Sequence, residues 1–253
     1  MTQLHKAAKN YLKKVNNIPS LATMTALEAR EMRAKLHPPK IKIARLASID
    51  DKAIRVRDGS NIPIRIYTPE GNGPFPIVIY YHGGGWVLND LNTCHESCSY
   101  LAKETNSIIV SVEYRLAPEY KFPVPLYDAY DAFLWVRANV ENLGGEKDLI
   151  SVAGDSAGGN LATAVTLLAK KEQQKIAAQI LLYPVTELSY NSVSYSTYAN
   201  GYGLDKDVMK WFGNYYIRQE GDIFNPLLAP LLADVRELPP AFVLVAENDV
   251  LRD

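Results

Sequence analysis

A serine placed between glycines is the part of this sequence whose residue types most clearly suggest chemistry. Residues 154–158 read Gly-Asp-Ser-Ala-Gly, which puts Ser156 at the centre of a G-x-S-x-G pattern. The glycines leave room for a sharp turn with a strained central residue. Where such a turn joins a strand to a helix, the helix N-terminus favours negative charge beside the serine hydroxyl. The pattern therefore predicts that Ser156 is a nucleophile, and a glycine loop that only caps a helix is the alternative.

A second glycine cluster offers the groups that a serine nucleophile needs. Residues 82–86 read His-Gly-Gly-Gly-Trp and directly follow an apolar run. Consecutive glycines add no side-chain packing, but their backbone N–H groups can approach an oxyanion closely. Acyl transfer needs such donors where a carbonyl oxygen becomes negatively charged, and each typically lowers the barrier by about 2.7–4 kcal/mol. A flexible loop is the alternative, and the presence of both motifs favours acyl transfer.

The residues around the second cluster have less specific roles. We expect His82 to be structural and to hydrogen-bond the loop rather than to act as a general base. Trp86 either flanks the site or packs inside the core, and both interpretations stay open. Cys94 and Cys98 are four residues apart with only His95 as a nearby third ligand type, so we expect two reduced thiols in a packed helix rather than a metal site.

The elements that must position these motifs alternate along the chain. Apolar, β-type runs cover residues 76–81, 107–112, 149–153, 178–183 and 241–246, and helical spacing covers residues 124–140 and 161–168. Strands separated by helical segments predict βαβ units and a mostly parallel sheet. Residues 53–56 and 62–67 flank the turn signal Asp58-Gly59 and predict an antiparallel hairpin. The predicted fold class is α/β, in a single domain over residues 1–253.

Two segments fall outside this alternation. Residues 1 to about 45 have a helical pattern, with Thr25 as the N-cap of one helix. Residues from about 188 to 220 are rich in Tyr, Ser and Asn and become helical from Asp205. We expect both segments to act as a helical cap over a site at the carboxyl ends of the strands.

Composition and charge exclude several classes of protein. The chain has 253 residues, of which 47% are hydrophobic and 22% charged, and its formal net charge is −1. These values are ordinary for a globular protein and give no electrostatic reason to bind nucleic acid. No apolar run approaches the roughly 20 residues that span a bilayer, and the first residues do not read as a signal peptide. We expect a cytoplasmic protein without stable membrane insertion.

The motifs resemble those of the hormone-sensitive-lipase-like carboxylesterases, a branch of the α/β-hydrolases. The segments that carry the resemblance are HGGGW at 82–86, YRLAPE at 114–119, GDSAGG at 154–159, and later landmarks at 225–226, 239–240 and 246–249. The resemblance implies an α/β-hydrolase fold with helices on both faces of the sheet. It also implies hydrolysis of short-to-medium acyl esters through an acyl-enzyme, with a small-molecule ester as the partner and no metal or organic cofactor.

The resemblance further implies roles for backbone groups and supporting side chains. The implied oxyanion donors are the N–H groups of Gly83, Gly84 and Ala157, and Gly85 is able to replace Gly83. Asp155 is adjacent to the nucleophile and cannot reach it as the acid of a triad, so we expect it to brace the loop. Glu247 is expected to play a similar supporting role, as is His82.

Ser156 resembles the family nucleophile and Asp249 resembles the acid of its triad, with Asp253 as the second choice of acid. The order Ser, acid, His is the one this fold uses. The histidines of the sequence all precede the serine: His5, His37, His82 and His95. A serine hydroxyl is a weak nucleophile without an adjacent histidine. We therefore expect this polypeptide to hydrolyse esters poorly or not at all.

The sequence ends four residues after Asp249, so we expect the last strand and helix of the fold to be missing from it. The apolar strand at 241–246 would then be an unpaired edge, which is a site of pairing with another chain. A homodimer through this edge or aggregation is the expected consequence. A catalytically inactive ligand-binding protein on the same fold, and an amidase or peptidase, are the alternatives to an esterase.

Overall fold

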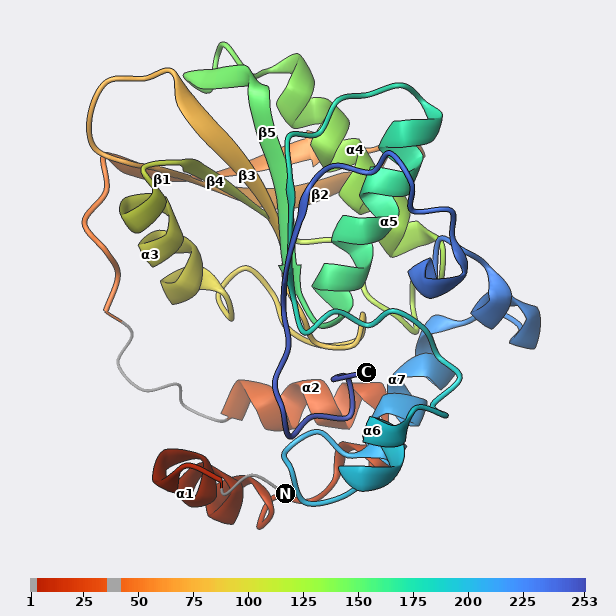
Figure 1. Cartoon of the computed structure of the whole chain (residues 1–253). Coiled ribbons are helices and arrows are strands. Elements are labelled where there is room, and N and C mark those ends of the chain that lie inside the picture. Colours follow the sequence, from red (N-terminus) through yellow and green to blue (C-terminus); the bar gives the residue numbers. More distant parts are fainter. Residues whose placement is uncertain (1–3, 36–41) are drawn as a thin grey trace.

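A sheet of seven strands forms the centre of the molecule, whose computed structural model describes residues 4–35 and 42–253 (Figure 1). The order across the sheet is β1-β2-β4-β3-β5-β6-β7. The pairs β1–β2 and β2–β4 are antiparallel, and the pairs from β4 to β7 are parallel. The strands are Ser48–Arg55 (β1), Asn61–Thr68 (β2), Phe75–Tyr81 (β3), Ile108–Val112 (β4), Gly145–Asp155 (β5), Gln179–Leu182 (β6) and Ala241–Leu244 (β7). The predicted α/β class and the mostly parallel sheet are confirmed.

Helices cover both faces of this sheet and one of its ends (Figure 1). The helices α4 and α5 pack together, with α5 against β3, β5 and β6, whereas α3 packs against β2 and β4 on the opposite face. The α-helices are Lys6–Val15 (α1), Ala26–Lys35 (α2), His95–Thr105 (α3), Val124–Ala138 (α4), Ala157–Lys171 (α5), Val193–Thr197 (α6) and Lys206–Tyr216 (α7). Short 3-10 turns lie at Leu21–Thr23 (η1), Glu220–Phe224 (η2) and Pro230–Leu232 (η3).

The central strands form because their apolar, β-branched residues are buried on both faces of the sheet. All five residues of β4 are buried, and β3 is buried at five of its seven positions. Such continuous apolar runs are typical of parallel strands covered by helices on both sides. The predicted hairpin around Asp58-Gly59 is also present, because β1 and β2 pair in antiparallel register.

Two strands extend beyond the runs that predicted them. β1 already begins at Ser48, where Asp51 pairs with Arg65 across the β1–β2 ladder through an ion pair of 2.6 Å. β5 already begins at Gly145, which pairs with Phe75 of β3. In both extensions most residues are polar and none is buried, so no hydrophobic alternation marks them as strand. Pairing with a neighbouring strand decides their conformation, because strand preference depends strongly on context.

The two segments outside the strand–helix alternation meet at the end of the sheet where β3 and β5 finish (Figure 1). Thr25 caps α2 as predicted, because its hydroxyl accepts a hydrogen bond from the Glu28 N–H (3.2 Å) while the Glu28 carboxylate accepts one from the Thr25 N–H (2.8 Å). The indole N–H of Trp211 in α7 donates to the Met24 carbonyl (2.8 Å). This hydrogen bond joins the N-terminal segment to α7.

The β7 strand forms one edge of the sheet and pairs only with β6 among the described residues. All four of its residues are exposed, with Phe242 at 58% and Val243 at 53%. The predicted exposed, apolar edge is therefore confirmed. Separately, none of the helices in residues 4–35 and 42–253 is both long and apolar enough to cross a membrane.

Candidate active site

Ser156 occupies a sharp bend between β5 and α5. Its backbone angles are φ 54° and ψ −117°, a combination that side-chain-bearing residues adopt rarely and at a cost of about 1–3 kcal/mol. The bend is fixed on both sides, because the Ser156 N–H donates to the Leu182 carbonyl (2.9 Å) and its carbonyl accepts from Val185 (3.2 Å). The side chain remains partly exposed. A strained serine at the end of a strand is the geometry that the G-x-S-x-G pattern predicts.

The glycine of this pattern at Gly158 is required by close contact with the neighbouring strand. A Cβ atom there would overlap the carbonyl oxygen of Tyr81, the last residue of β3. The first turn of α5 can therefore lie directly against the end of β3. Ala157 is the first residue of α5, and the N–H groups of a first helical turn have no partner within the helix. The Ala157 N–H is thus available beside Ser156.

The segment after β3, residues 82–88, is called the oxyanion loop below. It turns back on itself at Gly84, whose carbonyl accepts hydrogen bonds from Val87 (3.1 Å) and Leu88 (2.9 Å). Gly84 and Gly85 have φ values of 109° and 61°, which favour glycine. A Cβ atom at Gly85 would also overlap the ring of Phe212 in α7. Within the described ranges, the N–H groups of these two glycines donate no hydrogen bond.

Gly83 differs from its two neighbours because its N–H is already engaged. It donates to the Asp155 carboxylate at 2.9 Å, and the Tyr80 hydroxyl donates to the same carboxylate at 2.8 Å. Asp155 therefore ties the oxyanion loop to the bend that holds Ser156. Among the described residues, Gly84 and Gly85 are the loop glycines whose N–H groups have no partner, and Gly85 in place of Gly83 is the alternative that the sequence left open.

His82 supports the oxyanion loop from inside the core. Its Nδ1 donates to the Gly83 carbonyl (2.7 Å), its ring stacks on Tyr114 at 4.4 Å, and the Tyr114 hydroxyl donates to the His82 carbonyl (2.6 Å). A carbonyl only accepts, so Nδ1 carries the proton. Burial lowers the pKa of His82, which keeps the ring neutral. Among the described residues its Nε2 has no partner. The expected structural role of His82 matches these contacts.

Trp86 at the end of the glycine motif belongs to the core. Its side chain is fully buried and stacks on Tyr216 of α7 at 4.2 Å, with the rings nearly parallel. Of the two interpretations that the sequence left open, packing in the core is the correct one. This contact, like that of Phe212 with Gly85, holds α7 against the oxyanion loop.

Asp249 and Asp253, the two candidate acids, lie in the turn after β7 with different partners. The Asp249 carboxylate is half-buried and accepts a hydrogen bond from the Leu251 N–H (2.9 Å), and burial raises its pKa. The Asp253 carboxylate instead accepts from the Ser194 N–H (2.7 Å) and pairs with Arg252. Asp253 is thus engaged in holding α6 to this turn.

Tyr183 joins the end of β6 to the end of β7 through its backbone, although nothing in the sequence pattern singled it out. It follows β6, has a φ of 37°, and donates its N–H to the Leu244 carbonyl (2.6 Å). Burial first, and then the negative charges of Asp155 and Asp249, raise the pKa of its hydroxyl. Glu247 lies in the same turn as Asp249, where its side chain is exposed.

No histidine of residues 4–35 and 42–253 hydrogen-bonds to Ser156 or Asp249. His5 accepts a hydrogen bond from the Ala7 N–H at the start of α1, and His95 pairs with the Tyr67 hydroxyl (2.8 Å) at the start of α3. His37 lies outside the described residues. The structure therefore places a serine, an acid and a set of amide donors, and no described histidine joins them.

Cys94, the N-cap residue of α3, and Cys98, within α3, are free, buried thiols, as the sequence predicts. The Cys94 sulfur lies 3.2 Å from the Ser111 hydroxyl of β4. Both cysteines pack in a cluster with Tyr67 and Tyr80 on the α3 side of the sheet. They pack between α3 and the sheet, and no contact joins them to Ser156, Asp249 or the oxyanion loop among the described residues.

Comparison with known proteins places this arrangement in a family. A family model described as alpha/beta hydrolase fold matches residues 78–253. The arylesterase of Saccharolobus solfataricus is 42% identical over 205 residues, which cover 80% of this chain and 67% of that protein. The ethyl acetate hydrolase of Pseudomonas putida is 36% identical over 240 residues, or 91% of this chain and 76% of that protein.

A solved structure shows the same fold. The hyperthermophilic esterase of the archaeon Pyrobaculum calidifontis superimposes with a TM-score of 0.94 at 36% identity, over 99% of this chain and 82% of that one. Sequence and structure therefore agree with the resemblance carried by the two glycine motifs. The chain belongs to the carboxylesterase family of the α/β-hydrolases and is, by family, a carboxylic ester hydrolase.

Proposed function

We propose that the chain forms the nucleophile and oxyanion side of a serine esterase site. In this proposal the Ser156 Oγ attacks the ester carbonyl carbon, and its proton passes to a base. The carbonyl oxygen becomes negative and is stabilised by the N–H groups of Gly84, Gly85 and Ala157. The C–O bond to the alcohol then breaks, the alcohol leaves with the proton, and water releases the acid from the acyl-enzyme. Asp249 would orient the base.

The observation that carries this proposal is the connection between the two glycine motifs. The strained backbone of Ser156 would not persist without a surrounding structure that fixes it. Asp155, the residue before it, accepts the Gly83 N–H and so fixes the oxyanion loop relative to the same bend. A loop that only capped a helix would need neither feature. The test is hydrolysis of p-nitrophenyl butyrate with Ser156→Ala as the control, since the proposal requires this variant to lose all turnover above background.

The base is the part of the site that limits the proposed activity. None of the described histidines contacts Ser156, so the 253-residue chain should turn esters over slowly. Loss of a triad serine or histidine costs about 10⁶-fold in a well-characterised serine protease. Turnover of p-nitrophenyl butyrate at tens per second by the 253-residue chain, lost in Ser156→Ala, would contradict this part of the proposal. His37→Ala would then show whether His37 supplies the base.

A short-to-medium acyl ester is the proposed substrate. A cavity of about 500 Å³ lies between α1, the turn before α2 and α7. Its apolar wall includes Tyr11, Val15, Leu204 and Phe212, and polar groups such as Asn16 and Asp205 line the rest. Phe212 also lies against Gly85 of the oxyanion loop. Pockets with apolar walls and few polar anchors suit acyl chains. Rates measured over p-nitrophenyl esters from acetate to palmitate test this choice, and a maximum at palmitate would refute it.

A ligand-binding protein without catalysis is the second candidate, and the absence of a described histidine contact at Ser156 favours it. The two candidates differ in the fate of an ester. A binding protein would hold p-nitrophenyl butyrate unchanged, whereas even a slow esterase releases p-nitrophenol in proportion to enzyme. An amidase would cleave the matching anilide at a comparable rate. The cytoplasmic location expected from the sequence stays a prediction.

We further propose that the chain self-associates through the free edge of β7. Its alternate side chains, Phe242 and Leu244 on one face and Val243 on the other, are all exposed. An exposed apolar edge strand presents unpaired backbone groups to a second strand. Light scattering after size exclusion should show dimers or larger species, and Val243→Lys should shift them toward monomer. A monomer at high concentration in the unmodified chain would contradict this proposal.

A further inference from the structure

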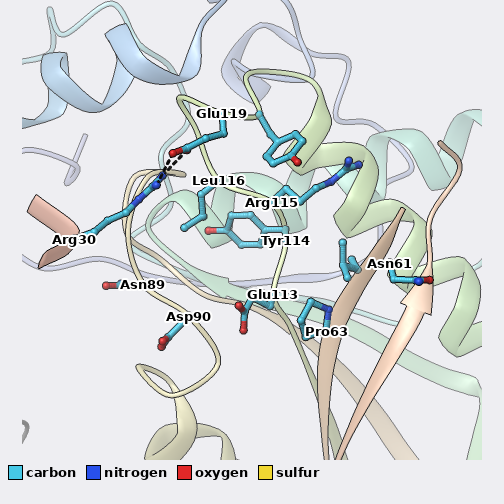
Figure 2. Close-up of a pocket in the computed structure, with 12 residues that line it drawn as sticks. Arg30, Asn61, Pro63, Asn89, Asp90, Glu113, Tyr114, Arg115, Leu116 and Glu119 are labelled. Atoms are coloured by element: carbon cyan, nitrogen blue, oxygen red, sulfur yellow. Dashed lines mark hydrogen bonds and ion pairs between the residues drawn. The ribbon is translucent and has the colours of Figure 1, made fainter. Parts of the chain in front are cut away.

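Arg30 of α2 reaches from the N-terminal segment to the oxyanion loop. Its Nε donates to the Val87 carbonyl (2.9 Å), and one terminal nitrogen donates to the Ala117 carbonyl (2.6 Å). Both terminal nitrogens also contact the Glu119 carboxylate, at 2.7 and 2.8 Å. Figure 2 shows this forked contact at the rim of a cavity of about 420 Å³, whose lining includes Asn89 next to the loop. A single guanidinium thus joins three segments that are distant in sequence.

The hydrogen bond from Arg30 to the Val87 carbonyl holds the turn that carries the Gly84 and Gly85 N–H groups. Val87 closes the turn that starts at Gly84, because its N–H donates to the Gly84 carbonyl (3.1 Å). The other end of the turn is fixed by Ala117, whose N–H donates to the Trp86 carbonyl (2.8 Å) and whose carbonyl accepts from Arg30. Arg30 thus holds the Val87 carbonyl directly, and it holds the Trp86 carbonyl indirectly through Ala117.

The geometry of the guanidinium explains why arginine occupies this position. Its planar fork can satisfy a bidentate carboxylate and still direct Nε at a carbonyl, which a lysine ammonium cannot do in one orientation. Glu119 holds the fork in place, and the Arg30 side chain is 28% exposed against 54% for Glu119. Helix α2 itself buries only Ala26 and Ala29. Arg30 is therefore the main polar attachment of α2 to the loop.

We propose that Arg30, oriented by Glu119, is a positioning residue that keeps the oxyanion loop in its donor geometry from the cap side. This role of Arg30 rests on the proposed function, in which Gly84 and Gly85 supply the donors. Arg30 itself touches no reacting atom. The donor geometry then depends on α2 being docked. Loss of the Arg30 contacts would leave the Val87 and Ala117 carbonyls without this support.

The first test measures the loop directly and needs no activity. Hydrogen–deuterium exchange of the peptide covering residues 82–90 is compared in the unmodified chain, Arg30→Met, Arg30→Lys and Glu119→Gln. Arg30→Met should speed exchange of the Val87 and Leu88 amides about tenfold, because their bonds to Gly84 open locally. Arg30→Lys and Glu119→Gln should give smaller increases. The peptide covering α5 should not change.

A matched control separates positioning from the loss of any ion pair. Arg57 also makes a forked contact, with Asp131 at 2.7 Å, and it does not touch the oxyanion loop. Arg57→Met should leave exchange at 82–90 unchanged. Unchanged exchange in Arg30→Met overturns the proposal. Faster exchange throughout the chain in that variant overturns it as well, since Arg30 would then act only on global stability.

The second test uses the proposed reaction. Arg30→Met should lower kcat for p-nitrophenyl butyrate on the order of tenfold while KM stays within about twofold, because misplaced donors weaken the transition state more than the bound substrate. A rise in KM at constant kcat would overturn the positioning role. Slow turnover is already expected without a histidine at Ser156, so the kcat comparison uses high enzyme concentration and long reaction times. The proposed function fails if butylboronic acid forms no bond with the Ser156 Oγ. The exchange experiment still decides the role of Arg30.

Discussion

Replacing Ser156 by glycine should make the protein more stable while removing its nucleophile. Ser156 has φ 54° and ψ −117°, which are the angles of a turn position that glycine fills without strain. A side chain held in such a region costs about 1–3 kcal/mol. Against this, glycine adds about 0.5–1 kcal/mol of backbone entropy to the unfolded chain. The balance favours Ser156→Gly over Ser156→Ala by about 1 kcal/mol, since alanine keeps the strain and removes only the hydroxyl.

The assay is urea unfolding of the two variants side by side, with the slope m required to be equal. For a chain of this size, about 1 kcal/mol corresponds to a rise of roughly 2–4 °C in Tm. Exposed Lys210 in the interior of α7 provides the control. There Lys210→Gly should be less stable than Lys210→Ala by about 1 kcal/mol, the opposite sign. If Ser156→Gly is no more stable than Ser156→Ala, the strain argument for the bend is wrong.

Three further predictions follow from packing and charge. Gly158→Ala should destabilise the protein by about 3 kcal/mol or more in urea, because its Cβ would overlap the Tyr81 carbonyl, and a normal unfolding midpoint would refute the contact. Gly85→Ala should lower ester hydrolysis, and a second change, Phe212→Ala, should restore part of it by making room, whereas no recovery would refute the overlap. Burial lowers the pKa of His82, so the folded state binds fewer protons than the unfolded state as the pH falls through about 6.5. Stability should therefore be full above that pH and fall below it, and His82→Asn should reduce the slope of the urea midpoint against pH; an unchanged slope would show that His82 does not titrate in this range.

The sequence predicted those parts of the molecule that local pattern controls. The strands of the central sheet are continuous apolar runs, and the turn at Ser156 is marked by glycines on both sides, so the fold and the bend could be recognised before any coordinates. The N-cap at Thr25 is equally local, because the capping hydrogen bonds join residues three apart. Buried strands and short-range caps leave a signal in composition and spacing.

The features that the sequence did not reveal depend on contacts between distant residues. The Gly83 N–H is taken by Asp155, 72 residues later in the chain, which is the contact behind the proposal that Gly84 and Gly85 are the donors. Arg30 contacts a loop 57 residues away, and its own helix gives no sign of this role. The Tyr183 N–H likewise donates to the carbonyl of Leu244, on another strand. Hydrogen bonds of this kind leave no periodic trace, so only the folded structure identifies them.

A crystal structure of the chain with butylboronic acid tests the central claim most directly, because boron can bond to a serine oxygen and mimic the tetrahedral intermediate. The account predicts a bond between boron and the Ser156 Oγ, with one boron-bound oxygen about 2.7–3.1 Å from the N–H groups of Gly84, Gly85 and Ala157. The Gly83 N–H should still donate to Asp155. A boron adduct whose oxygens all face solvent, or a Ser156 side chain directed away from these amides, would contradict it.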